Sequence, residues 1–276
     1  MKKLCLLFGI FVTTSTIQAA EFIGIIKPMD DIKVSVPLDG VVQNIYVKEG
    51  SYIKKGQKIL KLENRLQQLE VNRRKVIWKD KAQLNAAIKN REIHKSLLDS
   101  TKELYSQVKA VSHDEIQMLE SKYYTLSGDI KMREENEKKE KIEYSIAQNL
   151  LSKYTIKSPI SGVVIELELQ KGEWAKVGKP FIRIVNANSC YIDINIDESD
   201  SSRLKVGNKI IFTVKTKSVT AKKEGMITFI SSVADMASGL VRIKINFQNV
   251  KNRVTPGLSA IISIDDFSDS KSVEIK

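Results

Sequence analysis

The stretch VPLDGVVQNIYVKEGSYIKKG, from Val36 to Gly56, returns 122 residues later as SPISGVVIELELQKGEWAKVG, from Ser158 to Gly178. Both copies follow one frame: Pro-x-x-Gly-Val-Val, seven residues, Gly, five residues, Gly. A frame that repeats a proline and three glycines at the same spacing indicates a duplicated structural unit. The equivalent positions are Pro37 and Pro159, Gly40 and Gly162, Gly50 and Gly172, and Gly56 and Gly178.

Each copy has the pattern of β-strands. Apolar residues from Val34 to Val47 alternate with polar ones around Pro37 and Gly40, and the second copy repeats this from Ile156 to Leu169. The glycines stand at strand ends and turns, where positive φ or close backbone approach is needed. Neither copy has enough apolar residues for a core of its own. We therefore expect the two halves to pack by pseudo-twofold symmetry into one small β-sandwich.

The segment between the copies is predicted to be helical. From Gln57 to Ser158 it has no proline and one glycine, Gly128, and it is rich in Leu, Lys, Glu, Gln and Arg. It is too long for one globular helix, and the best break lies near Lys109 to His113. Ser112 opens a capping box, in which its side-chain oxygen is expected to accept from the N–H of Glu115 while the Glu115 carboxylate returns to the N–H of Ser112.

The two helical arms carry a coiled-coil pattern, with apolar residues at alternating spacings of three and four. In the second arm the predicted seam is Ile116, Leu119, Tyr123, Leu126 and Ile130; it fades through Arg133 and Glu137 and recovers at Ile142, Ile146 and Leu150. In the first arm it is Leu84, Ala87, Leu98, Tyr105 and Val108, with interruptions at Arg91, His94 and Thr101.

An antiparallel hairpin follows from the position of the repeats. If the two copies form one module, the insert must leave that module and return to it. The arms run from Glu63 to Lys109 and from Ser112 to Ser152, and each spans roughly 60–70 Å at the helical rise per residue. The turn near Lys109 to Val111 is then the far tip.

The remainder of the chain, residues 188–265, is predicted to form a small β-barrel or sandwich. Short alternating strands are punctuated by glycines, as in the runs IDINID, IIFTV, MITFI and VRIKINF. The acidic residues Asp193, Asp197, Glu198 and Asp200 lack the spacing of an EF-hand loop, so strand and turn charge is favoured over a calcium site. We expect no metal site in the chain.

The first twenty residues have the layout of a cleaved secretory signal. Lys2 and Lys3 precede a short apolar run, and small residues end it near Ala19 and Ala20. The chain has 276 residues and a formal charge of +12, which in a cytosolic protein suggests nucleic acid. An export signal and lysines mixed with glutamates favour a solvated surface instead, with possible contact to a membrane surface and no nucleic-acid partner. Beyond the signal Cys190 is the single cysteine, so we expect no internal disulfide.

The paired frames resemble the two halves of a biotinyl/lipoyl domain. Halves that are split by a long helical hairpin are similar to the periplasmic adaptor subunits, or membrane fusion proteins, of tripartite efflux and secretion systems. The resemblance implies an elongated α+β chain with a split lipoyl-like β-sandwich, a coiled-coil hairpin and a small β-barrel. The expected boundaries are a signal at 1–20, a strand segment at 21–33, the lipoyl-like halves at 34–62 and 154–187, the hairpin at 63–153, the barrel at 188–265 and a tail at 266–276.

Two other classes of protein remain open. Biotin carriers present a modified lysine on a tight turn between the halves, but here Lys61 leads directly into the helical insert, so a carrier is disfavoured and no cofactor is expected. A coiled-coil scaffold that self-associates is the other alternative. His94 and His113 lie in the insert without a matching cysteine or acid pair, and the chain has no evident catalytic constellation. We expect a protein that is not an enzyme.

The resemblance also implies partners and a site. Adaptors of this kind bridge an inner-membrane transporter, of RND or ABC type, to an outer-membrane channel, and they assemble as homo-oligomeric rings (trimers or hexamers) in the periplasm at the inner membrane. The hairpin tip meets the channel, which implicates Leu104, Tyr105, Val108, Val111, Ser112 and Glu115. Ser100 stands where the family tip has an arginine, so that contact is not carried over. With twelve residues after Ile264, we expect a membrane-proximal domain to be absent or vestigial.

Overall fold

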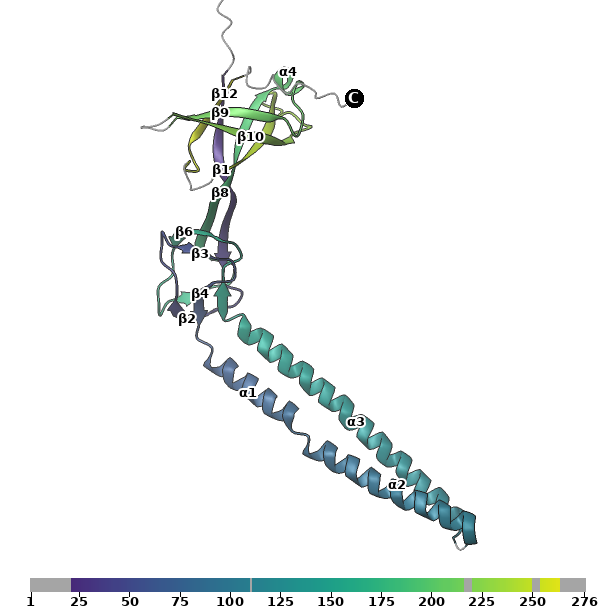
Figure 1. Ribbon diagram of the computed structural model, residues 1–276. Coiled ribbons are helices and arrows are strands. Elements are labelled where there is room, and N and C mark those ends of the chain that lie inside the picture. The colour runs from purple at the N-terminus through teal and green to yellow at the C-terminus, as the bar shows by residue number, and fades with distance from the viewer. Residues whose placement is uncertain (1–20, 110, 216–219, 250–253, 264–276) are drawn as a thin grey trace, which may run out of the picture.

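The computed structural model describes residues 21–109, 111–215, 220–249 and 254–263. These residues form an elongated molecule in which a β-barrel, a small β-module and a long helical hairpin follow one another (Figure 1). The predicted fold class is confirmed. The predicted signal at 1–20 and tail at 266–276 lie outside the described residues.

The small β-module is built from both repeat copies, and each of its sheets contains strands from both halves. The first copy supplies β2 (Gly40–Ile45), β3 (Tyr52–Ile53) and β4 (Lys58–Leu62). The second supplies β6 (Gly162–Leu167), β7 (Trp174–Ala175) and the start of β8 (Pro180–Asp197), after β5 (Thr155–Lys157). Because β2 pairs with β7, β3 with β6 and β4 with β5, each half extends the strands of the other.

The register of these pairs shows the twofold relation between the halves. Gly40 pairs with Ala175, and its equivalent Gly162 pairs with Ile53, which is the equivalent of Ala175. The same exchange holds for main-chain bonds, since Gly50 N–H donates to the Val164 carbonyl at 2.8 Å and Gly172 N–H to the Val42 carbonyl at 2.9 Å. Each half thus holds the other in place, around a core that includes Val42, Ile53, Leu60, Val164, Ala175 and Ile182.

Four of the repeated glycines are required by backbone conformation. Gly50, Gly56, Gly172 and Gly178 have φ values of 78°, 82°, 92° and 76°, a region that side chains with a Cβ rarely adopt. Gly162 is required for a different reason, because a Cβ there would lie 2.5 Å from the carbonyl oxygen of Val185.

Two long strands join the module to the barrel. β1 (Glu21–Ser35) pairs antiparallel with β8 from Ile25 to Ser35, so the connection is a two-stranded ribbon. The ribbon is irregular between Pro28 and Asp30, where the two parts meet. Buried Asn249 braces this point, since its N–H donates to the Asn188 carbonyl and its Nδ2 to the Ala187 carbonyl.

The barrel closes on itself. Its strands follow the order β1, β12 (Ser259–Ser263), β9 (Lys209–Lys215), β10 (Thr220–Ile230), β11 (Leu240–Gln248) and β8, and β8 pairs back to β1. The short helix α4 (Glu198–Ser201) follows β8. Inward residues of the alternating strands form the core, which includes Ile26, Ile192, Phe212, Ile227, Ile245 and Ile262. Cys190 lies in this core and burial raises the pKa of its thiol.

The hairpin has three helices instead of the two that were predicted. α1 (Arg65–Lys79) and α2 (Ala82–Val108) make the first arm, and the unbroken α3 (His113–Ser152) makes the second. At 1.5 Å per residue α3 is about 60 Å long. The first arm breaks at Asp80, whose backbone is extended and whose Oδ1 accepts from the N–H of Ala82 at 3.0 Å. That local bond competes with the helix and starts α2.

Candidate functional site

The tip of the hairpin is a tight, capped turn. α2 ends at Val108, and Lys109 takes a left-handed conformation with φ of 47°. Ser112 caps α3, but its Oγ accepts from the N–H of Asp114 at 3.1 Å and not from Glu115 as the capping box predicted. The break is where the sequence places it, and the partner differs because an N-cap oxygen can accept from the N–H of either the second or the third helical residue.

The predicted tip residues fall into two groups. Leu104, Val108, Ser112 and Glu115 are exposed, with Leu104 at 50% and Val108 at 67%. Tyr105 is half-buried between the arms, where its ring lies 6.4 Å from that of His113, and Val111 is also half-buried. The helix ends on either side of the turn therefore offer an apolar contact surface, and each of these ends is capped. Contact of this surface with a partner stays a prediction.

The seam between the arms differs from the predicted one in its second half. Along α3 the buried and half-buried positions continue in steps of three and four from Ile130 through Arg133, Glu137 and Glu140 to Tyr144. The predicted seam residues Ile142, Ile146 and Leu150 are instead 60%, 63% and 47% exposed. In the first arm Leu84, Ala87, Leu98 and Tyr105 line the seam as predicted, whereas Val108 is exposed because the helix ends there.

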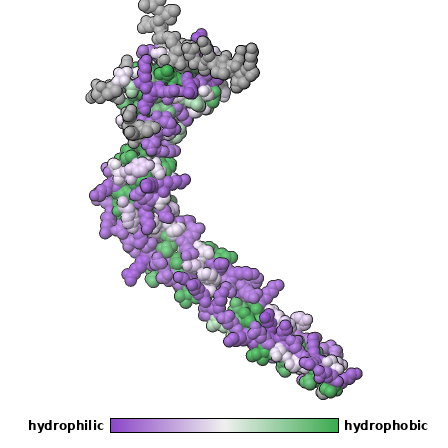
Figure 2. Space-filling view, in the orientation of Figure 1, coloured by the Kyte–Doolittle hydropathy of each residue, from purple (hydrophilic) through white to green (hydrophobic). Residues whose placement is uncertain are grey.

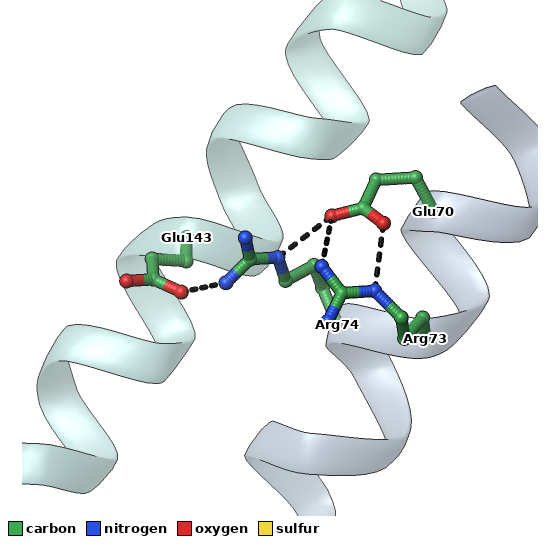
Figure 3. Close-up of polar contacts among 4 residues, drawn as sticks. All are labelled: Glu70, Arg73, Arg74 and Glu143. Carbon is green, nitrogen blue, oxygen red and sulfur yellow. Dashed lines mark hydrogen bonds and ion pairs between the residues drawn. The ribbon is translucent and has the colours of Figure 1, made fainter.

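Polar side chains close the base half of the seam (Figure 3). Arg74 of α1 bridges Glu70 on its own helix and Glu143 on α3, and Arg73 also binds Glu70. The hydrogen bonds from Arg73 and Arg74 lower the pKa of Glu70 to about 2. One turn further along, the rings of Trp78 and Tyr144 stack with their centroids 5.3 Å apart.

Further contacts cross the seam beyond the break. Lys81 pairs with Glu137 at 2.7 Å, and Arg133 donates to the Gln83 side chain at 2.9 Å. Nearer the tip, Lys102 pairs with Glu120 at 2.5 Å. These polar contacts take the place of the apolar contacts expected in the predicted seam. They hold α1 and α2 against the single helix α3 on both sides of the break at Asp80.

The ribbon between module and barrel is braced by ion pairs on its surface. Arg183 of β8 binds Asp31 of β1 through Nε at 2.8 Å and Nη2 at 2.7 Å, and its Nη1 reaches Glu166 on β6. On the barrel side Asp193 accepts from Arg242 and from Lys27, which lowers its pKa to about 2. Asp193, one of the four acidic residues considered as calcium ligands, is therefore paired with basic side chains of the chain itself.

The carrier alternative can be compared with this geometry. Lys61 lies inside β4, paired with Asn44 and Thr155, and β4 continues after two residues into α1. A carrier lysine has to stand on an exposed tight turn. Lys61 does not, so the structure gives no support to a swinging-arm role.

A family model, the YknX barrel-sandwich hybrid domain, matches residues 35–185, which contain both repeat copies and the whole hairpin. The chain belongs to the YknX barrel-sandwich hybrid family. The match covers the split module whose two halves complete each other's sheets, and the hairpin inserted between them. The resemblance to membrane fusion proteins of efflux systems is confirmed by this match and by the relatives described next.

A curated relative and two solved structures are similar to the chain over most of its length. The chain is 22% identical over 238 residues to the cation efflux system protein CzcB of Alcaligenes sp., covering 86% of this chain and 42% of that protein. Thus it spans about two fifths of the length of this curated relative. MacA from Actinobacillus actinomycetemcomitans shares the fold with a TM-score of 0.74 at 22% identity, covering 88% of this chain and 78% of MacA. The membrane fusion protein Spr0693 from Streptococcus pneumoniae has a TM-score of 0.56 at 17% identity, with 86% and 97% of the two chains covered.

The chain thus carries the barrel-sandwich hybrid domain of its family, and its relatives include proteins named as a cation efflux system protein and as a membrane fusion protein. None of the helices in the described part of the chain has the length and hydropathy that a membrane-spanning helix needs. In the same residues no group of three or more His, Cys, Asp or Glu side chains is arranged to hold a metal ion. The barrel, the small β-module and the hairpin follow one another along an elongated molecule (Figure 1).

Proposed function

We propose that this protein is a non-enzymatic periplasmic adaptor that bridges an inner-membrane transporter, of RND or ABC type, to an outer-membrane channel for export. The observation that carries the proposal is the length and order of the parts. A hairpin of about 60 Å stands on a module whose two halves lock each other, and the barrel lies beyond a braced ribbon (Figure 1). Such an object separates two contact surfaces by a fixed distance.

In this proposal the tip meets the channel. The exposed apolar side chains of Leu104 and Val108 stand beside a turn that is capped on both sides, so the contact surface is preorganised. The module and barrel meet the transporter and neighbouring copies, and ring assembly raises modest individual affinities. The predicted leader supports export to the periplasm.

Site-specific photocross-linking in cells tests the tip. A cross-linking amino acid at Val108 is expected to capture an outer-membrane protein, and adding Leu104→Asp with Val111→Asp to that chain is expected to abolish the capture. The control position is Tyr124, which is 71% exposed on α3 and more than two helical turns from its start.

Two outcomes would sink the tip role. One is equal capture of outer-membrane protein from Val108 and Tyr124. The other is undiminished capture by the double aspartate variant at normal abundance of the protein. Capture of an inner-membrane transporter from barrel positions in the same cells would separate a failed tip assignment from a failed adaptor function.

A further inference from the structure

A cavity of about 620 Å³ lies where the barrel meets the small β-module. Its walls come from β1 and β8, from β6 of the module, and from the segment Val254 to Gly257 that precedes β12. Of the fifteen described residues that line it, ten are apolar, counting Tyr191, and three are charged. Hydrophobic residues also show on the surface at the narrow neck between barrel and module (Figure 2). This volume, this lining and a position between two structural parts are typical of a site for a small molecule.

Two irregularities in the strands shape the cavity. β6 has an extra residue at Ile165, where its register with β8 shifts. β1 has a comparable irregularity between Pro28 and Asp30. A β-bulge redirects the side chain of the extra residue, and Ile165 lines the cavity while it remains 46% exposed. Part of its apolar surface is therefore available to a ligand.

The end of the cavity at the module has a negative balance of charge. Arg183 donates two hydrogen bonds to Asp31 and a third to Glu166. One cation there faces two carboxylates, so this end does not favour an anionic group.

The end of the cavity at the barrel has a positive balance of charge. Asp193 is paired with both Lys27 and Arg242, so two cations share one carboxylate. Lys244 adds a third cation, with its Nζ 5.2 Å from the ring centroid of Tyr191 in the cavity wall. The Lys27 side chain is 43% exposed, and its bond to Asp193 uses one of the three donors of an ammonium group. Lys27 can therefore donate to an anion in the cavity.

We propose that this cavity binds an amphipathic organic anion, a molecule with an apolar body and one carboxylate or sulfonate. The anionic group lies at the Lys27 ammonium, where it accepts a charge-assisted hydrogen bond. The apolar body lies between Ile165 of the module and Tyr191 and Pro256 of the barrel. The site goes beyond the adaptor function and does not depend on it, because the hairpin tip takes no part in it.

Fluorescence titration of the purified full chain tests the site. The probe is anilinonaphthalene sulfonate, which has an apolar body and one sulfonate, and it is expected to bind saturably. Dodecanoate is expected to displace it. Dodecyltrimethylammonium has the same chain with a positive head, and it is expected to displace the probe roughly tenfold less well, as the loss of one charge-assisted hydrogen bond implies.

One pair of variants tests the apolar wall. Ile165→Glu places a carboxylate at the apolar body of the ligand and is expected to weaken binding of the probe by about tenfold or more. The matched control is Met226→Glu, because Met226 is also 46% exposed but lies on β10 outside this cavity. That variant is expected to bind the probe like the unmodified chain. Circular dichroism and urea unfolding check that both variants fold.

A third variant tests the anionic group and decides the question if Ile165→Glu does not fold. Lys27→Gln removes the ammonium, while Asp193 keeps its two hydrogen bonds from Arg242. Displacement of the probe by dodecanoate should weaken roughly tenfold. Displacement by dodecanol, which is uncharged, should not change.

Four results would overturn the proposal. The first is an unmodified chain without saturable binding of the probe. The second is equal weakening by Ile165→Glu and Met226→Glu in folded chains, or undiminished binding in both Ile165→Glu and Lys27→Gln. The third is equal displacement by dodecanoate and dodecyltrimethylammonium, which would make the cavity an apolar site without preference for anions. The fourth is displacement by phosphatidylglycerol vesicles and not by dodecanoate, which would make the surface a membrane contact.

Discussion

Gly162 and Gly40 are equivalent in the repeat, but their surroundings differ. Replacing each with alanine therefore tests the effect of packing at positions that the sequence makes alike. A Cβ at Gly162 would lie 2.5 Å from the Val185 carbonyl oxygen and 2.8 Å from its carbon, so the backbone of β8 has to move. A Cβ at Gly40 would lie 3.5 Å from the Leu62 side chain, which is ordinary contact. We expect opposite effects from the same substitution in the two halves.

The magnitudes follow from two opposing terms. Overpacking costs about 1–3 kcal/mol, and the contact with a backbone carbonyl puts Gly162→Ala at the upper end of that range. Replacing glycine with alanine also restricts the unfolded chain, which stabilises by about 0.4–1 kcal/mol. Gly162→Ala should therefore destabilise the module by about 2 kcal/mol, and Gly40→Ala should leave it unchanged or stabilise it by about 0.5 kcal/mol. With a urea dependence of about 1–2 kcal/mol per molar, the two midpoints differ by roughly 1–2 M.

Urea unfolding followed by tryptophan fluorescence measures this difference. Trp174 lies in β7, paired with Val41 beside Gly40, and reports on the module once Trp78→Phe removes the signal from the hairpin. All variants carry that background. Equal midpoints for Gly162→Ala and Gly40→Ala would refute the argument that β8 packs directly on the Gly162 backbone, and a more stable Gly162→Ala would reverse it.

Three further predictions concern the barrel and the first arm. Arg242 and Lys27 lower the pKa of Asp193 to about 2, so the stability that the ionised carboxylate contributes is fully present above the usual carboxyl pKa and is lost as pH falls from about 4 toward 2. Asp193→Asn should therefore lower the free energy of unfolding by about 2 kcal/mol at neutral pH. It should also flatten the acid dependence of that free energy in urea titrations. Asp80→Ala removes the side-chain hydrogen bond to the Ala82 N–H and should cost about 1 kcal/mol of local stability. Amide hydrogen exchange at the start of α2 should then be roughly fivefold faster. Unchanged exchange would show that the break does not need this bond. The Cys190 thiol should react with a thiol reagent at neutral pH only after urea unfolding, since burial raises its pKa and covers it; rapid labelling of the folded chain would contradict the barrel core.

Much of the architecture follows from the sequence because it depends on spacing. The repeated frame requires two like halves, and a helical insert between halves that touch has to be a hairpin. Four of the glycines are fixed by backbone conformation, which is a local property, and so the repeat reveals them directly. The tip break is marked by Ser112, whose side chain caps α3.

The seam shows where sequence patterns stop being sufficient. Ile142, Ile146 and Leu150 have helical spacing, yet they lie outside, while Glu137 and Tyr144 lie between the arms. The reason is that α3 is continuous, so the register set by Ile116 and Ile130 persists along it whatever residues fall on it. The break at Asp80 was not predicted either, since it contains no proline or glycine; an aspartate two residues before the new helix was the available signal.

The sequence by itself determined the duplicated β-unit, the hairpin and its turn, because each depends on contacts between near neighbours or on a spacing that repeats. Only the tertiary structure decided which apolar residues of the hairpin are buried between the arms and which, such as Ile142, Ile146 and Leu150, stay exposed. That choice depends on how two helices and an interruption in one of them fit together over about 60 Å, which no single stretch of sequence contains.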